Sequence, residues 1–265
     1  MTPPVALTIA GSDSGGAAGI QADLRTFAAL GVFGTTAITC TTAQNSIEVR
    51  AVNALPGALV RQQVEAVLDD LPVRGAKTGL LPSEEIVREV ASLSHRLPPL
   101  VVDPVLVATS GARLADDATM VACLRHLFPV AAVVTPNVAE AAVLLGRELS
   151  TLEDAREAAR RLGEHTAVVV VKGGHLSQLP VSVDVVWDGQ ESWEISRPRI
   201  ATGNTHGSGC TFSAAVAAGL AQGMAVRESV ERANEFVHAA LEGSAGWHLG
   251  AGAGPLDHFG WKDGP

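Results

Sequence analysis

Short hydrophobic runs alternate along this chain with longer segments in which apolar residues recur at helical spacing. Short apolar runs bounded by Gly or Pro indicate buried strands, and the helical spacing indicates one buried helix face. This alternation predicts an α/β fold: one domain over residues 1–265, with a mostly parallel central sheet and helices on both faces. The predicted strands cover residues 5–10, 35–39, 75–77, 100–102, 131–135 and 167–171, and the predicted helices 19–30, 58–70, 83–95, 116–127, 137–146, 151–163, 207–223 and 226–243.

Three segments depart from the alternation. Residues 47–55 favour a small β flap, and residues 183–187 and 192–196 favour a hairpin across Asp188-Gly189. The Gly-rich segment at residues 250–261 predicts irregular structure.

Composition narrows the classes of partner. The chain is 47% hydrophobic and carries a formal net charge of −9, which argues against nucleic acid or an anionic membrane as the partner. No stretch approaches the roughly 20 apolar residues of a membrane span, and the N-terminus lacks the pattern of a signal peptide. Three distant cysteines outside any C-x-x-C pair fit a reduced compartment. We therefore expect a cytoplasmic protein.

Polar side chains gather where the predicted strands end. In α/β sheets, ligands bind at the carboxyl ends of the strands, so these residues should meet in one place. The candidates at this edge are Asp13, Gln44, Asp103, Asn137 and Lys172.

A Gly-rich loop leads into a helix of small residues within residues 200–223. The start of such a helix exposes N–H groups and a positive dipole end, so Gly207, Gly209 and Cys210 predict an anion cradle. The spacing matches neither a Walker loop nor the dinucleotide fingerprint. The alternative is that the glycines serve close helix packing and that Cys210 is a small buried apolar residue.

The chemistry of Cys210 stays open at this level. A helix N-terminus lowers a thiol pKa, but a bound triphosphate opposes the shift, so the net direction is not fixed by the sequence. His206 lies four residues earlier, but two ligands without further His or Cys nearby make a zinc site improbable.

Oxygen ligands at the same edge suit Mg²⁺. Asp103 and Glu140 are the predicted metal contacts, directly or through water, while Asn137 and Glu140 have capping of their own helix as the alternative. Lys172 is placed to reach a nucleotide phosphate, or is simply an exposed charge. Gln44 presents a donor beside an acceptor, which matches a ring nitrogen next to an exocyclic amine, although a loop Gln is usually only solvated.

Seven motifs stand in order along the chain: AGSDSGGAAGIQADLRTF (10–27), TTAQNS (41–46), KTGLL (77–81), VVDPVLVATSG (101–111), TPNVAEAAVLLG (135–146), VVKGGH (170–175) and NTHGSGCTFSAAVAAGLAQG (204–223). In these motifs the chain resembles hydroxymethylpyrimidine/phosphomethylpyrimidine kinase, a thiamine-pathway family of the ribokinase-like superfamily. The resemblance implies two ATP-dependent phosphorylations, of 4-amino-5-hydroxymethyl-2-methylpyrimidine and then of its monophosphate, with Mg²⁺, in a homodimer.

The resemblance also assigns roles to individual residues. Cys210 stands where ribokinase relatives carry an Asp base, and Ala17 and Thr109 depart from the residues usual at their positions. The implied roles are catalysis by Cys210 with Gly207 and Gly209, substrate binding by Gln44, Gly11 and Asp23, nucleotide binding by Asn137, Lys172 and Thr205, and metal binding by Asp103 and Glu140.

Two other functions compete with this one. A pyridoxal-type vitamin kinase would hold a similar flat hydroxymethyl heterocycle. A non-catalytic protein that binds the pyrimidine on the same scaffold would have no need of the cradle. A dehydrogenase is a distant third, because the dinucleotide fingerprint is missing.

Overall fold

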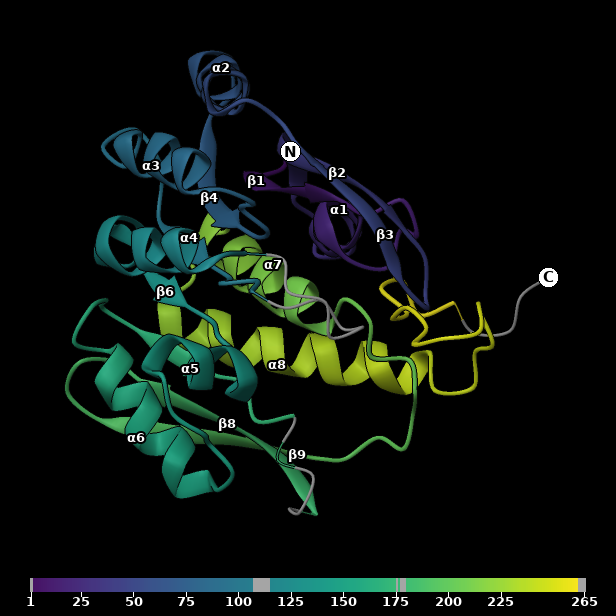
Figure 1. Cartoon of the computed structure of the whole chain (residues 1–265). Helices are drawn as coiled ribbons and strands as arrows, with labels where there is room; N and C mark the ends of the chain where they lie inside the picture. Colours follow the sequence, from purple (N-terminus) through teal and green to yellow (C-terminus); the bar gives the residue numbers. More distant parts are fainter. Residues whose placement is uncertain (1, 107–114, 175, 177–179, 262–265) are drawn as a thin grey trace.

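The computed structural model describes residues 2–106, 115–174, 176 and 180–261. Within these residues, nine strands form one sheet in the order β3-β2-β1-β4-β5-β6-β7-β8-β9 (Figure 1). The strands are β1 (Val5–Ser12), β2 (Phe33–Gln44), β3 (Val49–Ala54), β4 (Val73–Thr78), β5 (Leu100–Val102), β6 (Val133–Val134), β7 (Val169–Val171), β8 (Val181–Trp187) and β9 (Ser192–Pro198).

The six inner strands, from β2 to β7 in the sheet order, pair in parallel. Strands β3, β8 and β9 each pair antiparallel with the preceding strand of the chain. The mostly parallel sheet is confirmed, and so is the hairpin across Asp188-Gly189. All six parallel strands direct their carboxyl ends to one edge of the sheet.

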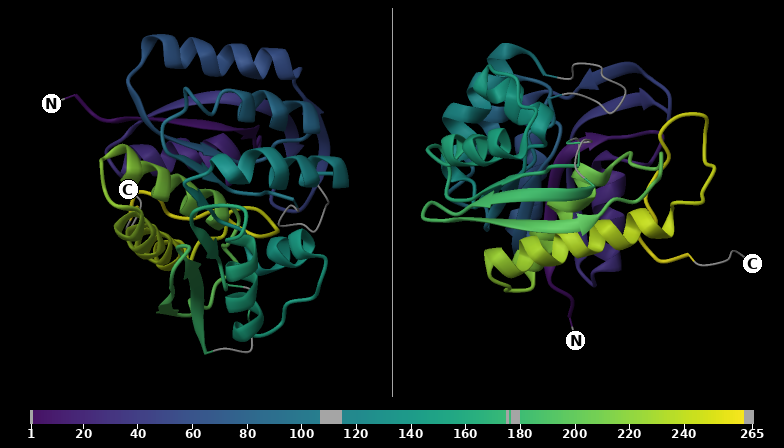
Figure 2. Two further views of the ribbon diagram at one scale, coloured as in Figure 1. Left: turned by 90° about the vertical axis from the view of Figure 1, so that its left-hand side faces the viewer. Right: turned by 90° about the horizontal axis from the view of Figure 1, so that it is seen from below.

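Helices cover both faces of this sheet (Figures 1 and 2). Buried side chains of α2 to α6 pack on one face, and those of α1, α7 and α8 pack on the other. The helices are α1 (Gly19–Ala29), α2 (Gly57–Asp70), α3 (Glu84–Ser92), α4 (Asp117–Ala122), α5 (Val138–Leu145), α6 (Leu152–Leu162), α7 (Ser208–Ala221) and α8 (Val226–Gly243), with a π turn at Cys123–Leu127 and a 3-10 turn at Phe128–Val130 after α4.

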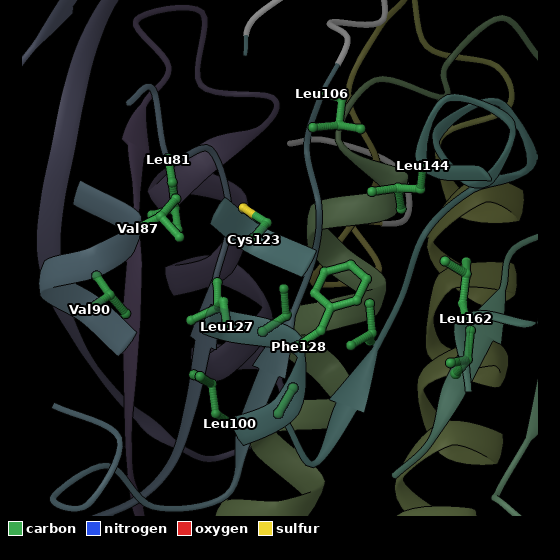
Figure 3. Packing of buried hydrophobic residues seen from close by; sticks show 14 of the residues in the cluster. Leu81, Val87, Val90, Leu100, Leu106, Cys123, Leu127, Phe128, Leu144 and Leu162 are labelled. Carbon is green, nitrogen blue, oxygen red and sulfur yellow. The ribbon is translucent and has the colours of Figure 1, made fainter. Parts of the chain in front are cut away.

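Successive strand residues point to opposite faces, which divides the core into two clusters. Val102 and Val134 belong to the cluster under α2 to α6, whereas Val101 and Val133 belong to the cluster under α1, α7 and α8. Figure 3 shows part of the first cluster, with Leu127 and Phe128 among side chains of α3 and α5. Strands buried on both faces explain why the sequence shows continuous apolar runs here.

Helix α7 approaches the sheet closely because small residues stand at the contact. A Cβ added at Gly75 of β4 would lie 2.5 Å from the carbonyl oxygen of Ala217. Most of α7 is buried and small-chained, so it is a core helix with no polar face.

The largest difference from prediction concerns β2. The strand was expected to end at residue 39, but it continues to Gln44 and pairs there with β3. This outer part is partly exposed, so its side chains are mostly polar and lack the apolar signal of a buried strand. The predicted flap at 47–55 is confirmed as the second strand of that hairpin.

The predicted caps agree with the structure. The Ser83 hydroxyl accepts from the Ile86 N–H at the start of α3, and Thr151 and Asp154 form a capping box at α6. No helix among the residues described is long and apolar enough to cross a membrane.

The segment after α8 crosses back over the sheet edge. The Gly252 N–H donates to Ser46 Oγ in the β2–β3 turn, and the Gly254 carbonyl accepts from the His206 N–H. Further along, His258 Nε2 lies 2.9 Å from Thr211 Oγ1 of α7. This C-terminal segment therefore connects the hairpin, the loop before α7, and α7 itself.

The contact at His258 predicts a pH-dependent stability. Burial, assisted by the positive charge of Arg25, lowers the pKa of His258 to about 4 from its usual 6.5. Between those values the unfolded chain binds a proton that the folded chain does not, so acid favours unfolding. As the pH falls from 6.5 to 4, the wild type should lose up to about 3 kcal/mol of its free energy of unfolding through His258. We expect His258→Gln not to show this loss.

Urea unfolding at several pH values measures this effect. Replacement of the exposed His248 by Gln is the matched control for removing an imidazole outside the core. If the free energy of unfolding of His258→Gln falls with decreasing pH as steeply as that of the wild type, His258 is not the group responsible.

Candidate active site

A cavity of about 600 Å³ opens at the carboxyl edge of the parallel strands, where the predicted polar residues meet. Its walls come from the loops after β1, β5, β6 and β7, the end of β2, the start of α7, and α8. All the predicted site residues except Asp23 line it: Gly11, Gln44, Asp103, Asn137, Glu140, Lys172, Thr205, Gly207, Gly209 and Cys210.

The cradle is built by the first turn of α7. The N-cap Gly207 has φ +86° and makes no side-chain cap, and a Cβ added there would lie 1.9 Å from the Ala17 carbonyl oxygen. The N–H groups of Gly209 and Cys210 have no acceptor in the part of the chain that the structure describes. Free N–H groups at a helix start facing a cavity fit a phosphate group.

Asp13 organises the opposite wall, the loop between β1 and α1. Its buried carboxylate accepts from the N–H groups of Gly15, Ala17 and Ala18 at 2.8–3.0 Å. Burial opposes ionisation, but the contact with His206 and these hydrogen bonds outweigh it and lower the pKa of Asp13. Asp13 thus fixes the backbone against which Gly207 packs.

Gln44 and His206 meet at one end of the cavity. Gln44 Nε2 lies 3.1 Å from His206 Nε2, which in turn lies 3.5 Å from Asp13 Oδ2. The contact was not predicted from the sequence, because 162 residues separate the two side chains. The exposed-loop alternative for Gln44 does not describe it, since its side chain is held at the cavity wall.

Asp103 and Lys172 form a charged pair at the other end. Lys172 Nζ donates to Asp103 Oδ1 at 3.0 Å, while Asp103 also accepts from Ser213 of α7 and Thr135. Burial raises the pKa of Asp103, but Lys172 and then Lys77 outweigh it, so the pKa is lowered overall. Lys172 is therefore not merely an exposed charge at a strand end.

Asn137 and Glu140 form a capping box at the start of α5. Asn137 Oδ1 accepts from the Glu140 N–H, and Glu140 Oε2 accepts from the Asn137 N–H. Burial raises the pKa of Glu140 to about 7, with a further contribution from the negative charge of Asp103. The capping alternative is thus realised, while both residues still line the cavity.

These contacts decide how well the site fits Mg²⁺. Asp103 and Glu140 are each engaged by protein donors, and the residues described hold no group of three or more His, Cys, Asp or Glu side chains arranged for a metal. The pair does not fit as a direct cage in this arrangement. Metal binding at Asp103 and Glu140 therefore stays a prediction.

Cys210 lies half-buried in the cavity wall. Burial raises the pKa of its thiol to about 12, although the positive charge of Lys77 and the Gly19 N–H act in the opposite direction. The sequence left open whether the pKa of Cys210 is raised or lowered. In the free protein it is raised, so Cys210 is a protonated thiol at neutral pH.

Comparison with known proteins places this geometry in a family. The family model described as phosphomethylpyrimidine kinase matches residues 13–257. A hydroxymethylpyrimidine/phosphomethylpyrimidine kinase of Rhizobium meliloti (strain 1021) is 46% identical over 98% of this chain and 99% of its own. This chain belongs to the phosphomethylpyrimidine kinase family.

Solved structures share the fold of this phosphomethylpyrimidine kinase family member. Bacillus subtilis pyridoxal kinase, solved as an ADP complex, matches with a TM-score of 0.88 and 38% identity, over 97% of this chain and 98% of that one. Phosphomethylpyrimidine kinase of Clostridium difficile 630 matches with a TM-score of 0.79 and 35% identity, over 90% and 99%. The ribokinase-like fold implied by the resemblance is confirmed.

One predicted site residue of this family member needs a correction. Asp23 does not line the cavity, because its side chain is fully buried in an ion pair with Lys77 and a hydrogen bond from Thr8. Of the two departures noted in the sequence, Ala17 packs its carbonyl against Gly207, whereas Thr109 lies outside the described residues.

The backbone contact of Gly207 gives a direct test of the cradle. In Gly207→Ala, the new methyl group would collide with the Ala17 carbonyl, so the first turn of α7 must move. We expect turnover of ATP to fall at least about 100-fold, a loss typical of misplaced phosphate-binding groups.

Gly223→Ala is the matched control at the other end of the same helix. Gly223 has φ +85°, but a Cβ there meets nothing within 4 Å. This variant should lose stability of about 1 kcal/mol from backbone strain yet keep its activity. Equal activity losses in the two variants would show that strain alone, and not the contact with Ala17, matters.

Proposed function

We propose that this protein phosphorylates 4-amino-5-hydroxymethyl-2-methylpyrimidine with ATP, and then phosphorylates the monophosphate to the diphosphate. The observation that carries the proposal is one cavity that joins Gln44, the Gly207–Cys210 cradle and Lys172 in a member of the phosphomethylpyrimidine kinase family. Pyridoxal phosphorylation is the second candidate, because the pyridoxal kinase structure is at least as similar as the phosphomethylpyrimidine kinase structure.

In this proposal, one end of the cavity binds the pyrimidine ring and the other binds the phosphoryl group. Gln44, held by His206, offers a carboxamide edge that pairs with a ring nitrogen and its neighbouring amine. Lys172, with the free N–H groups of Gly209 and Cys210, would hold the transferring phosphoryl group. Phosphoryl transfer requires alignment and charge neutralisation more than covalent participation by the protein, which suits this arrangement.

Mg²⁺ would supply further neutralisation of the nucleotide phosphates when it is bound. The carboxylates of Asp103 and Glu140, which both line the cavity, would contact its water shell.

Cys210 is the proposed acceptor of the hydroxyl proton. The substrate oxygen bonds to the γ-phosphorus, ADP leaves, and the hydroxyl proton passes to sulfur. Because the sulfur rests as a thiol, it must first release its own proton to solvent, and the positive charge of Lys77 favours that release.

We further propose a homodimer in the cytoplasm. The family resemblance supports the dimer, and so do the apolar side chains of Ile47 and Val52, which are exposed in the β2–β3 hairpin. Free cysteines at positions 40, 123 and 210 are in keeping with a reducing compartment.

The function is tested by incubating the protein with ATP, Mg²⁺ and the pyrimidine, and resolving the products by mass spectrometry. We expect the diphosphate to appear after a monophosphate intermediate, with Gln44→Ala losing pyrimidine turnover. Turnover of pyridoxine in place of the pyrimidine would favour the second candidate. Binding of the pyrimidine without binding of ATP would favour a non-catalytic protein.

The role of Cys210 predicts a difference between the two steps. In the first step the nucleophile is an alcohol that must lose a proton, whereas a phosphate monoester with a second pKa of about 6 is already largely deprotonated in the second. We expect Cys210→Ala to slow the first step about 100-fold or more, and the second far less.

Single-turnover rates with each purified substrate separate the two steps. Equal losses in both would mean that Cys210 shapes the cradle and does not take the proton. Cys123→Ala, in the core away from the cavity, controls for general effects of removing a buried thiol.

A further inference from the structure

Lys77 and Asp23 form an ion pair in which both side chains are fully buried. Lys77 Nζ lies 2.9 Å from Asp23 Oδ1, and Asp23 Oδ2 accepts from Thr8 Oγ1 at 2.6 Å. Removing two charges from water costs so much that apolar replacement of such a pair is often neutral or stabilising. Fold stability alone is therefore a weak explanation for this pair.

The geometry of β4 and α7 directs Lys77 toward Cys210. Gly75 packs on Ala217, and Lys77, two residues later, points to the same face of the sheet. The residues of α7 that lie nearer the carboxyl end of the sheet come earlier in the helix, because Ser213 donates a hydrogen bond to Asp103 just beyond β5. Lys77 therefore faces the first turns of α7, which contain Cys210.

A second connection runs through α1. Asp23 lies on this helix one turn after Gly19, whose N–H acts to lower the pKa of the Cys210 thiol. The ion pair thus joins two elements, β4 and α1, that both pack against α7. The other charges that act on this region are Asp103 after β5 and Lys172 after β7.

We propose that the Lys77–Asp23 pair sets the proton affinity of Cys210 from beneath the cavity, with Lys77 favouring the thiolate and Asp23 favouring the thiol. Lys77 is a positioning residue in this scheme, because it acts through Cys210 and is not among the residues that line the cavity. The role of the pair in catalysis rests on the proposed function. Its effect on the Cys210 thiol does not, because that effect exists without substrate or ATP.

The test is alkylation of Cys210 by iodoacetamide at pH 8 without ATP or substrate. The thiolate attacks the methylene carbon, a thioether forms and iodide leaves, so the rate follows the thiolate fraction. Peptide mass spectrometry separates Cys210 from the buried Cys40 and Cys123. We expect Asp23→Asn to speed alkylation and Lys77→Met to slow it, each about three- to tenfold, since lower thiolate nucleophilicity offsets part of the shift.

The opposite signs distinguish this proposal from a structural role. If the pair only supported packing, either substitution would loosen the site and speed alkylation. The double variant Asp23→Asn/Lys77→Met removes both charges and should return close to the wild-type rate. If Lys77→Met does not fold, the double variant must still react more slowly than Asp23→Asn, and equal rates would overturn the proposal.

Failure of this proposal and failure of the proposed function give different results. If the protein turns over the pyrimidine but neither substitution changes the alkylation rate of Cys210, the ion pair is structural and the kinase assignment stands. If Asp23→Asn is alkylated faster and Lys77→Met more slowly than the wild type, but the pyrimidine is not a substrate, the charge effect stands and another alcohol is the acceptor.

Discussion

The direct packing of α7 on the sheet is the contact on which the site depends. Small residues make it: Gly75 admits the backbone of the helix, and Gly207 brings the helix start against the carbonyl of Ala17. Larger side chains at either position would separate the two backbones by several ångströms. Because α7 lies so close, its free N–H groups open onto the same edge as the strand ends, and one short helix turn faces residues from both halves of the sheet.

Charge in the site is balanced pair by pair. The chain as a whole is acidic, and the cavity proposed to bind phosphate has Asp103 in its wall, with Asp23 buried outside it. Lys172 neutralises the first and Lys77 the second, each at 2.9–3.0 Å. In the proposed site, the backbone dipoles at the start of α7 add to Lys172 an attraction for phosphate that does not change with pH.

The sequence could predict the sheet, most helices and the edge at which the polar residues meet, because these follow from local periodicity and from the rule for strand ends. It could not predict Lys77 as a partner of Asp23. Fully buried lysines are rare, and the strand order that brings β4 beside β1 is a long-range property. For Glu140 the local pattern fitted both a cap and a ligand, and only the fold showed its cap. The outer half of β2 was missed because an exposed hairpin carries no apolar run.

The C-terminal segment has a consequence for how the protein is made. Its contacts with Ser46, His206 and Thr211 connect residues 252–258 to the β2–β3 turn, the loop before α7 and α7 itself. A nascent chain can form the inner strands early, but the Gln44 side of the cavity lacks this brace until residues near 258 have left the ribosome. The cavity is therefore completed well after the strands that carry most of its polar residues have been synthesised.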